Sequence, residues 1–146
     1  MAKEYPATMH TAEHILNQTM VRMFNCSRSF SNHIEKKKSK CDYHFERDLT
    51  QEEVNELQSR VNNVIRQNFD VKEEFIPRKD AAELFDLDRL PDAVGETIRI
   101  IKIGDYDSCP CIGQHVNNTV EIGEFSIISR NFEDGVLRLR FKVENK

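Results

Sequence analysis

Two histidines four residues apart, His10 and His14, constrain the fold of this chain more than any other feature of its sequence. Apolar side chains recur at helical spacing from Thr8 to about Phe24, which predicts a helix that begins just after Pro6. Residues four apart lie one above the other on a helix, so both imidazoles can contact one bound ion. A metal site is one interpretation. A catalytic pair and ordinary packing of one buried and one exposed histidine are the alternatives.

A second pair with the same spacing, Cys111 and His115, lies far downstream. It follows an isoleucine-rich segment that predicts a strand, in a loop that contains Pro110 and Gly113. Three imidazoles and one thiolate form the nitrogen and sulfur donor set that suits tetrahedral zinc (Zn2+). Each pair alone is a weak signal, and Cys111 could instead be a small buried apolar side chain. A loop of this kind can bring both of its side chains to one ion without strain.

The remaining segments predict an α+β fold, with helices packed on an antiparallel or mixed sheet. The clearest helix lies within residues 49–69, where Thr50 and Glu53 form a capping-box pattern. A hairpin should close the chain, with strands at 124–129 and 136–144 joined through residues 131–135 and an Asp134-Gly135 turn. The other expected elements are an extended stretch at 29–35, a strand at 39–47, a strand at 71–76 stopped by Pro77, a short helix at 80–85 and a strand at 96–104.

Composition limits the class of protein. A chain of 146 residues fits one domain over residues 1–146. No apolar run is long enough to span a bilayer, and the first ten residues lack an apolar signal core, so we expect a cytoplasmic protein with no membrane partner. The formal net charge of -4 argues against binding nucleic acid by bulk charge alone, and no DNA partner is expected. The oligomeric state stays open.

Two segments together resemble a known family. The stretch "MHTAEHIL" followed by "CIGQHVNNTVEIGEFSI" is similar to the editing domain of alanyl-tRNA synthetase, and still more to its free-standing relatives, the AlaX proteins. The editing domain of threonyl-tRNA synthetase is a more distant relative. The resemblance covers nearly the whole chain and implies the same α+β fold. It also implies a hydrolase that cleaves the ester of mischarged tRNA in trans, typically serine or glycine on alanine tRNA, without making alanyl-tRNA itself. In that family the zinc ligands fall on His10, His14, Cys111 and His115.

The chain departs from the family pattern at positions that bear on the substrate. The second motif usually reads Cys-Gly-Gly-Thr-His, and Gln114 replaces the threonine here. A hydroxyl group helps free-standing relatives choose serine over alanine, and Ser31 falls near that position, with Ser29 as a second candidate. We therefore assign Ser31 and Gln114 to the catalytic site by resemblance. Cys109, beside the second motif, is interpreted as a spectator.

The resemblance also implies that the acceptor end of tRNA is the partner. A basic run and two arginines of the last strand are candidate contacts to its phosphates, although the run could equally be a solvated hairpin turn. Phe30 and Tyr43 could stack on the terminal base, with core packing as the alternative for both. The candidate tRNA contacts are Lys36, Lys37, Lys38, Lys40, Arg138 and Arg140.

Three other functions remain as alternatives. One is a zinc-binding or RNA-binding module without catalytic activity, and another is a deacylase for serine on threonine tRNA. A zinc peptidase is a distant third, because His10 to His14 matches the pattern H-x-x-E-H with Glu13 as its base. On a helix Glu13 points away from the two histidines, so we interpret it as a solvated surface residue.

Overall fold

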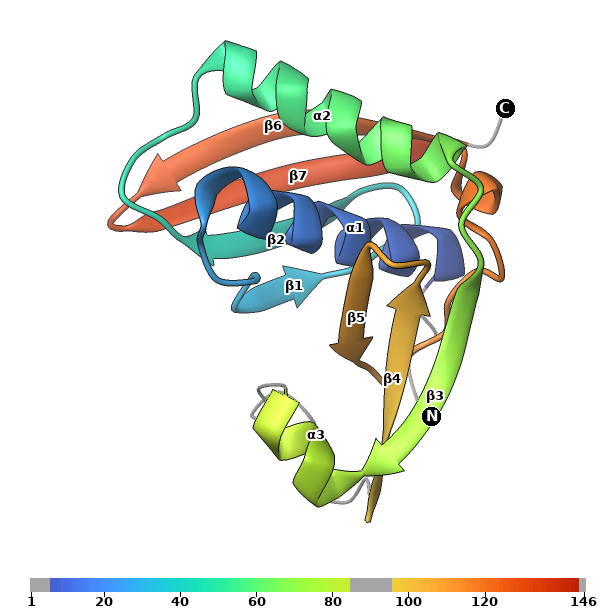
Figure 1. The fold of residues 1–146 in the computed structure, drawn as a ribbon. Helices are drawn as coiled ribbons and strands as arrows, with labels where there is room; N and C mark the ends of the chain where they lie inside the picture. Colours follow the sequence, from blue (N-terminus) through green and yellow to red (C-terminus); the bar gives the residue numbers. More distant parts are fainter. Residues whose placement is uncertain (1–5, 85–95, 145–146) are drawn as a thin grey trace.

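Two antiparallel sheets and the helices packed against them form the protein, as a computed structural model shows (Figure 1). The structure describes residues 6–84 and 96–144. This arrangement confirms the predicted α+β class, although the strands form two sheets where a single sheet was expected. One sheet has the strand order β1-β2-β7-β6 and the other the order β3-β4-β5. In chain order the elements are α1 (Ala7–Phe24), β1 (Ser31–His33), β2 (Ser39–His44), α2 (Gln51–Arg66), β3 (Val71–Pro77), α3 (Arg78–Leu84), β4 (Thr97–Ile103), β5 (Asp107–Pro110), the 3-10 helix η2 (Thr119–Ile122), β6 (Glu124–Glu133) and β7 (Val136–Glu144).

Helices α1 and α2 cover one face of the four-stranded sheet (Figure 1). Helix α1 ends at Asn25, whose left-handed φ of 54° stops the helical hydrogen-bond pattern. Helix α2 begins with the predicted capping box, in which Thr50 and Glu53 each accept a backbone N–H from the other. The apolar side chains along one side of each helix pack against inward side chains of β2 and β7, such as Tyr43 and Phe141. In the part of the chain that the structure describes, no helix is long and apolar enough to cross a membrane.

Side chains alternate across the four-stranded sheet as its pleat requires. Cys41 and Tyr43 of β2 point into the core, and the strand predicted at 39–47 ends at His44. The closing hairpin turns at Asp134 and Gly135, whose φ values of 50° and 80° suit a two-residue turn. Strand β6 continues to Glu133, so the hairpin is longer than the sequence predicts.

The three-stranded sheet carries the second sequence motif. Strand β4 lies between β3 and β5, and Ile101 of β4 pairs with Cys109 of β5. The sequence predicts a loop where β5 forms, because four residues that end in proline give no readable period. Helix α3 confirms the predicted short helix up to Leu84, and Phe85 lies outside the described residues. Because β5 ends at Pro110, Cys111 immediately follows an edge strand that packs against α1.

Candidate metal centre

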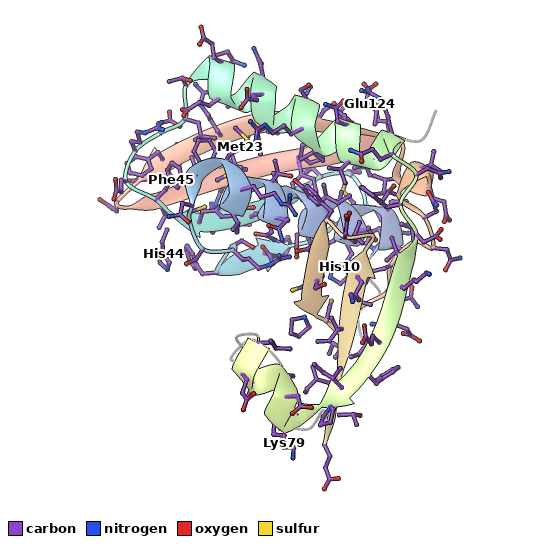
Figure 2. The ribbon with its side chains drawn as sticks, in the orientation of Figure 1. His10, Met23, His44, Phe45, Lys79 and Glu124 are labelled. Carbon is purple, nitrogen blue, oxygen red and sulfur yellow. The ribbon has the colours of Figure 1, made fainter. Side chains whose placement is uncertain are left out.

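Three imidazoles and one thiol meet where α1 passes β5. One ligand atom from each lies within 4.8 Å of those from the other three. The Cys111 Sγ atom is 3.3 Å from His10 Nε2 and 3.5 Å from His115 Nε2. Figure 2 labels His10, which lies on the first part of α1, the helix that packs against β5. The fold thus brings both sequence pairs together as one group, called the His/Cys cluster below: His10, His14, Cys111 and His115.

In each imidazole, Nδ1 is the nitrogen that points away from the centre of the cluster, and it faces an oxygen atom. His10 Nδ1 donates to the backbone carbonyl of Gln114 at 3.1 Å, and His115 Nδ1 lies 2.9 Å from Thr11 Oγ1. His14 Nδ1 lies 3.6 Å from Asp107 Oδ2, which is beyond hydrogen-bond distance. Such oxygen partners fix the tautomer and ring orientation of histidines that bind metals through the opposite nitrogen. All three rings can therefore present Nε2 to one ion.

Asp107 is a buried carboxylate that joins this cluster to a wider network. Arg28 donates to both of its oxygens, at 2.8 and 3.3 Å, and Gln18 Nε2 donates to one of them at 2.9 Å. Although burial raises the pKa of Asp107, the close contact with the His14 ring and the Arg28 charge hold it well below its usual range. The carboxylate is therefore ionised next to His14, as in carboxylate–histidine–metal arrangements.

The electrostatics of the cluster favour a deprotonated sulfur. Burial raises the pKa of Cys111, but hydrogen bonds with His10, His115 and His14 outweigh it and lower the pKa to about 3. Burial is the main cause that lowers the pKa of His115 to about 4, so this ring is neutral near neutral pH. Burial lowers the pKa of His14 as well, yet the charge of Glu13 and the contact with Asp107 raise it well above its ordinary value. Zinc requires a thiolate and neutral imidazoles, so the side chains of Cys111 and His115 are ready to bind it, whereas His14 must release its proton.

The loop that carries Cys111 approaches α1 too closely for any side chain at Gly113. A Cβ atom there would lie 2.2 Å from His10 Cε1 and 2.5 Å from His10 Nδ1. Arg99 holds this loop from the other side, because it donates to the backbone carbonyls of Cys111 at 3.2 Å and Gly113 at 2.7 Å. Its Nε atom also contacts Glu73 at 2.7 Å. The glycine and the arginine together set the distance between the loop and His10.

Removing the Thr11 hydroxyl should weaken metal binding without touching a ligand. Thr11 is fully buried, and its Oγ1 accepts from the Val116 backbone N–H at 3.1 Å besides contacting His115. We expect Thr11→Val to weaken zinc affinity by about 10- to 100-fold, as for other partners of ligand histidines. Thr11→Ser keeps the hydroxyl and should retain near-normal affinity. Competition with a chromophoric chelator measures both variants, and equal affinity of the two would contradict the role given to the hydroxyl.

Cys111 should be the reactive thiol of the metal-free protein. A lowered pKa keeps the thiolate present until the pH falls to about 3, whereas burial raises the pKa of both Cys109 and Cys26. Alkylation with iodoacetamide at about pH 6 should therefore modify Cys111 first, since the thiolate is the nucleophile. Peptide mass spectrometry gives the site, and added zinc should protect it. Equal labelling of all three thiols would contradict the assigned electrostatics.

Glu13 is buried, so its interpretation as a solvated surface residue was wrong. Its two carboxylate oxygens accept hydrogen bonds from Asn17 Nδ2 at 2.7 Å and Asn32 Nδ2 at 3.0 Å. The prediction assumed a helix with one exposed face, but α1 is enclosed, with Met9 through Asn17 all buried. Glu13 therefore links α1 to β1 within a hydrogen-bonded network.

The predicted substrate residues lie in different environments. The Gln114 side chain is exposed, while its backbone carbonyl faces His10. Ser31 is exposed on β1, and Ser29 is buried, with its backbone N–H donating to Asn17 and its hydroxyl to Asn32. Their roles in catalysis stay predictions.

The candidate stacking residues separate into core and surface. Tyr43 is fully buried in the core, which favours the packing interpretation. Phe30 is 40% exposed, and its ring stacks on His44 at a centroid distance of 4.0 Å.

The candidate tRNA contacts also differ among themselves. Lys36, Lys37 and Lys38 are exposed in the loop between β1 and β2, as the hairpin-turn interpretation predicts. Arg138 binds the carboxylate of Asp42 through two hydrogen bonds of 2.7 and 3.0 Å. Its guanidinium group is thus already neutralised. Lys40 and Arg140 pair directly across β2 and β7.

The residues that orient the His/Cys cluster were not predicted from the sequence. Thr11, Asp107, Arg28 and Arg99 hold the cluster in place through hydrogen bonds and ion pairs. Thr11 stands beside His10 in the sequence, which is the one local signal. The others reach the cluster only through the pairing of β4 with β5 and the packing of α1 on that pair.

Comparison with known proteins places this chain beside the alanine–tRNA ligases. Residues 98–140 match the threonyl and alanyl tRNA synthetase second additional domain. The alanine–tRNA ligase of Aeropyrum pernix is 32% identical over 137 residues, or 90% of this chain and 15% of that protein. That of Caldicellulosiruptor saccharolyticus is 33% identical over 150 residues (96% and 16%), and that of Methanococcus maripaludis strain C7 is 31% identical over 140 residues (92% and 16%). The chain thus spans only 15–16% of these relatives.

Proposed function

We propose that this chain, a relative of the alanyl-tRNA synthetases that carries the threonyl and alanyl tRNA synthetase second additional domain, hydrolyses mischarged alanine tRNA. The relationship supports an editing role in the alanyl-tRNA system, in which the ester to a wrong amino acid, serine or glycine, is cleaved. The observation that carries the proposal is the convergence of the His/Cys cluster within the region of similarity. We propose deacylation alone for this chain.

The donor set of the His/Cys cluster fits zinc, and we assign all four of its residues as ligands. With all four ligands bound, zinc has no open position; if His115 gives up its place, zinc would hold and orient the aminoacyl group or lower the pKa of a bound water molecule. His10 and His14 are buried, whereas Cys111 and His115 are only partly buried. The aminoacyl group therefore reaches the cluster from the side of the downstream loop.

The chain's own residues orient the ester for attack by water. Gln114 presents its side chain at that exposed side and its backbone to His10, so we assign it to contact with the aminoacyl group. We keep Ser31 as the proposed contact to the substrate hydroxyl. Water adds to the ester carbonyl carbon, the carbon–oxygen bond to the ribose breaks, and the ribose oxygen leaves with a proton. Because this ester is labile, correct positioning supplies most of the needed acceleration.

The substrate is tested by comparing two mischarged tRNAs. We expect zinc-loaded protein to release serine from serine-charged alanine tRNA, and more slowly from serine-charged threonine tRNA. Correctly charged alanine tRNA is the control and should stay intact. Preference for threonine tRNA would make the protein a deacylase of the other system. Release from neither, by folded protein with zinc bound, would contradict the proposed reaction and favour a binding module without catalytic activity.

A further inference from the structure

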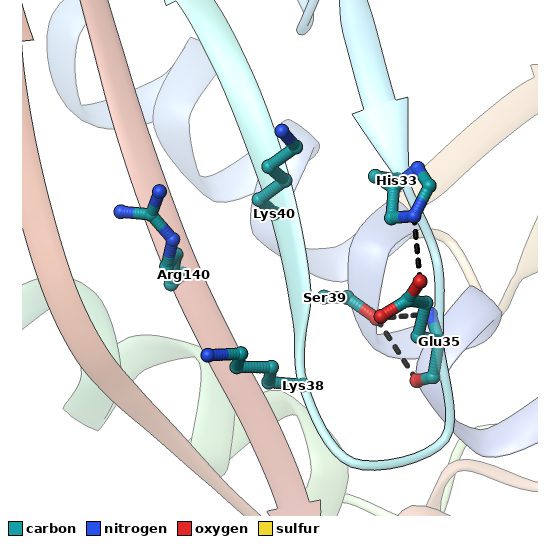
Figure 3. Close-up of a pocket in the computed structure, with 6 residues that line it drawn as sticks. All are labelled: His33, Glu35, Lys38, Ser39, Lys40 and Arg140. Carbon is teal, nitrogen blue, oxygen red and sulfur yellow. Dashed lines mark hydrogen bonds and ion pairs between the residues drawn. The ribbon is translucent and has the colours of Figure 1, made fainter.

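The outward face of the four-stranded sheet carries a positively charged hollow of about 190 Å³ (Figure 3). His33, Lys40 and Arg140 form one row across it, because His33 pairs with Lys40 and Lys40 pairs with Arg140. Lys38 adds a third full positive charge from the loop that leads into β2. Glu35 and Ser39 complete the lining. This face is opposite the one covered by α1 and α2, since inward and outward side chains alternate along β2 and β7.

Lys40 and Arg140 repel each other in the protein alone. Like charges directly opposite on neighbouring antiparallel strands are destabilising. The next outward pair, Asp42 with Arg138, has opposite charges and forms two hydrogen bonds. Ion pairs within the described ranges include Arg138 and Lys142 on this face of β7, but none includes Lys38, Lys40 or Arg140. The described residues therefore keep an opposed pair of cations with which no carboxylate forms an ion pair.

The acidic groups near the hollow are already engaged. Glu35 lies 2.6 Å from His33 Nε2, and its backbone N–H and carbonyl bind the Ser39 hydroxyl (Figure 3). The hydrogen bond from Arg138 lowers the pKa of Asp42 despite its burial, and the charges of Lys40 and Arg140 lower it further. The local field is thus positive in a chain whose net charge is -4. Such a local patch attracts anions although the whole protein does not.

We propose that this hollow binds a backbone phosphate of the RNA substrate through Lys38, Lys40 and Arg140. A phosphodiester supplies the negative charge that the row lacks, and Arg140 offers paired donors that match phosphate oxygens. The inference rests on the proposed function, because that function makes RNA the polyanion which the protein meets. Arg138 is not part of this proposed phosphate site, because Asp42 already neutralises its charge.

Binding of an uncharged RNA hairpin with the acceptor-stem sequence of alanine tRNA tests the inference. The variant Lys40→Gln/Arg140→Gln removes the opposed pair. The matched control is Lys72→Gln/Lys102→Gln, which removes two lysines that pair across β3 and β4, where Glu74 lies 3.3 Å from Lys102. Fluorescence anisotropy across a salt series gives the affinity and the slope of log K against log salt for each protein.

We expect the Lys40→Gln/Arg140→Gln variant to bind on the order of tenfold more weakly at low salt, with a salt slope shallower by about one unit for each lost phosphate contact. The control should keep the slope of the unmodified protein. Equal slopes for the two variants would overturn the inference. The variant should also melt at the same temperature as the unmodified protein or higher, because a repulsion is removed, and a clear drop would contradict the repulsion argument.

The result is independent of whether the protein is a deacylase. The uncharged hairpin contains no ester, so its binding requires no hydrolysis. Normal hydrolysis by the unmodified protein, together with equal RNA binding by both variants, would overturn phosphate binding at the hollow and leave the proposed function intact. Absence of hydrolysis, together with the predicted change in slope, would reject the deacylase and retain the phosphate site.

Discussion

Replacing both His10 and His14 with alanine is expected to reduce bound zinc from one ion per chain to none. The double variant leaves two of the four donors, Cys111 and His115, on a loop that α1 no longer contacts through the metal. Loss of an orienting partner alone costs about 10- to 100-fold in affinity, and loss of two ligands costs more. Elemental analysis after gel filtration gives the zinc content, and deacylation of serine-charged alanine tRNA should fall with it.

The matched control for this variant is a histidine outside the His/Cys cluster. His44 is exposed on β2, where its ring stacks on Phe30. His44→Ala should retain one zinc ion per chain. Full zinc content in the double variant would show that the ion binds elsewhere and would contradict the assignment of the cluster.

Adding one methyl group at Gly113 is expected to have the second largest effect. In Gly113→Ala the new Cβ would overlap His10 Cε1 at 2.2 Å, so either the His10 ring or the loop must move. Both movements separate His10 Nε2 from Cys111 Sγ, which are now 3.3 Å apart. We expect zinc affinity to fall by about 10- to 100-fold, and the free energy of unfolding to fall by about 1–3 kcal/mol, typical of overpacking.

The neighbouring residue in the same loop separates a steric effect from a general loosening. Ile112 is 61% exposed, so Ile112→Ala removes little packing. Its zinc affinity should match that of the unmodified protein in the same chelator competition. If Gly113→Ala and Ile112→Ala bind zinc equally well, the close approach at His10 does not control the site.

Local spacing predicted the two residue pairs that meet in the His/Cys cluster, and most of the elements. Helical geometry alone places His10 and His14, four residues apart, on one side of α1. The capping box at Thr50 likewise depends only on the four residues from Thr50 to Glu53. The hairpin turn at Asp134 and Gly135 is likewise set by two residues. Each of these features depends on contacts close in the sequence, which is why a pattern could predict them.

Features that depend on tertiary neighbours could not be predicted. Glu13 is buried because α1 is enclosed by other elements, and no periodicity within α1 indicates that. Asp107 lies next to His14 only because β5 pairs with β4 and packs on the helix. The opposition of Lys40 and Arg140 depends on the register of β2 with β7, which residues far apart in the sequence determine.

The dependence of hydrolysis on zinc tests the central claim most directly. Protein stripped with a chelator would receive zinc in steps, while the release of serine from serine-charged alanine tRNA is followed at each step. We expect the rate to rise in proportion to occupancy and to stop rising at one ion per chain, because the His/Cys cluster binds a single ion. An unchanged rate in the metal-free protein would contradict the account.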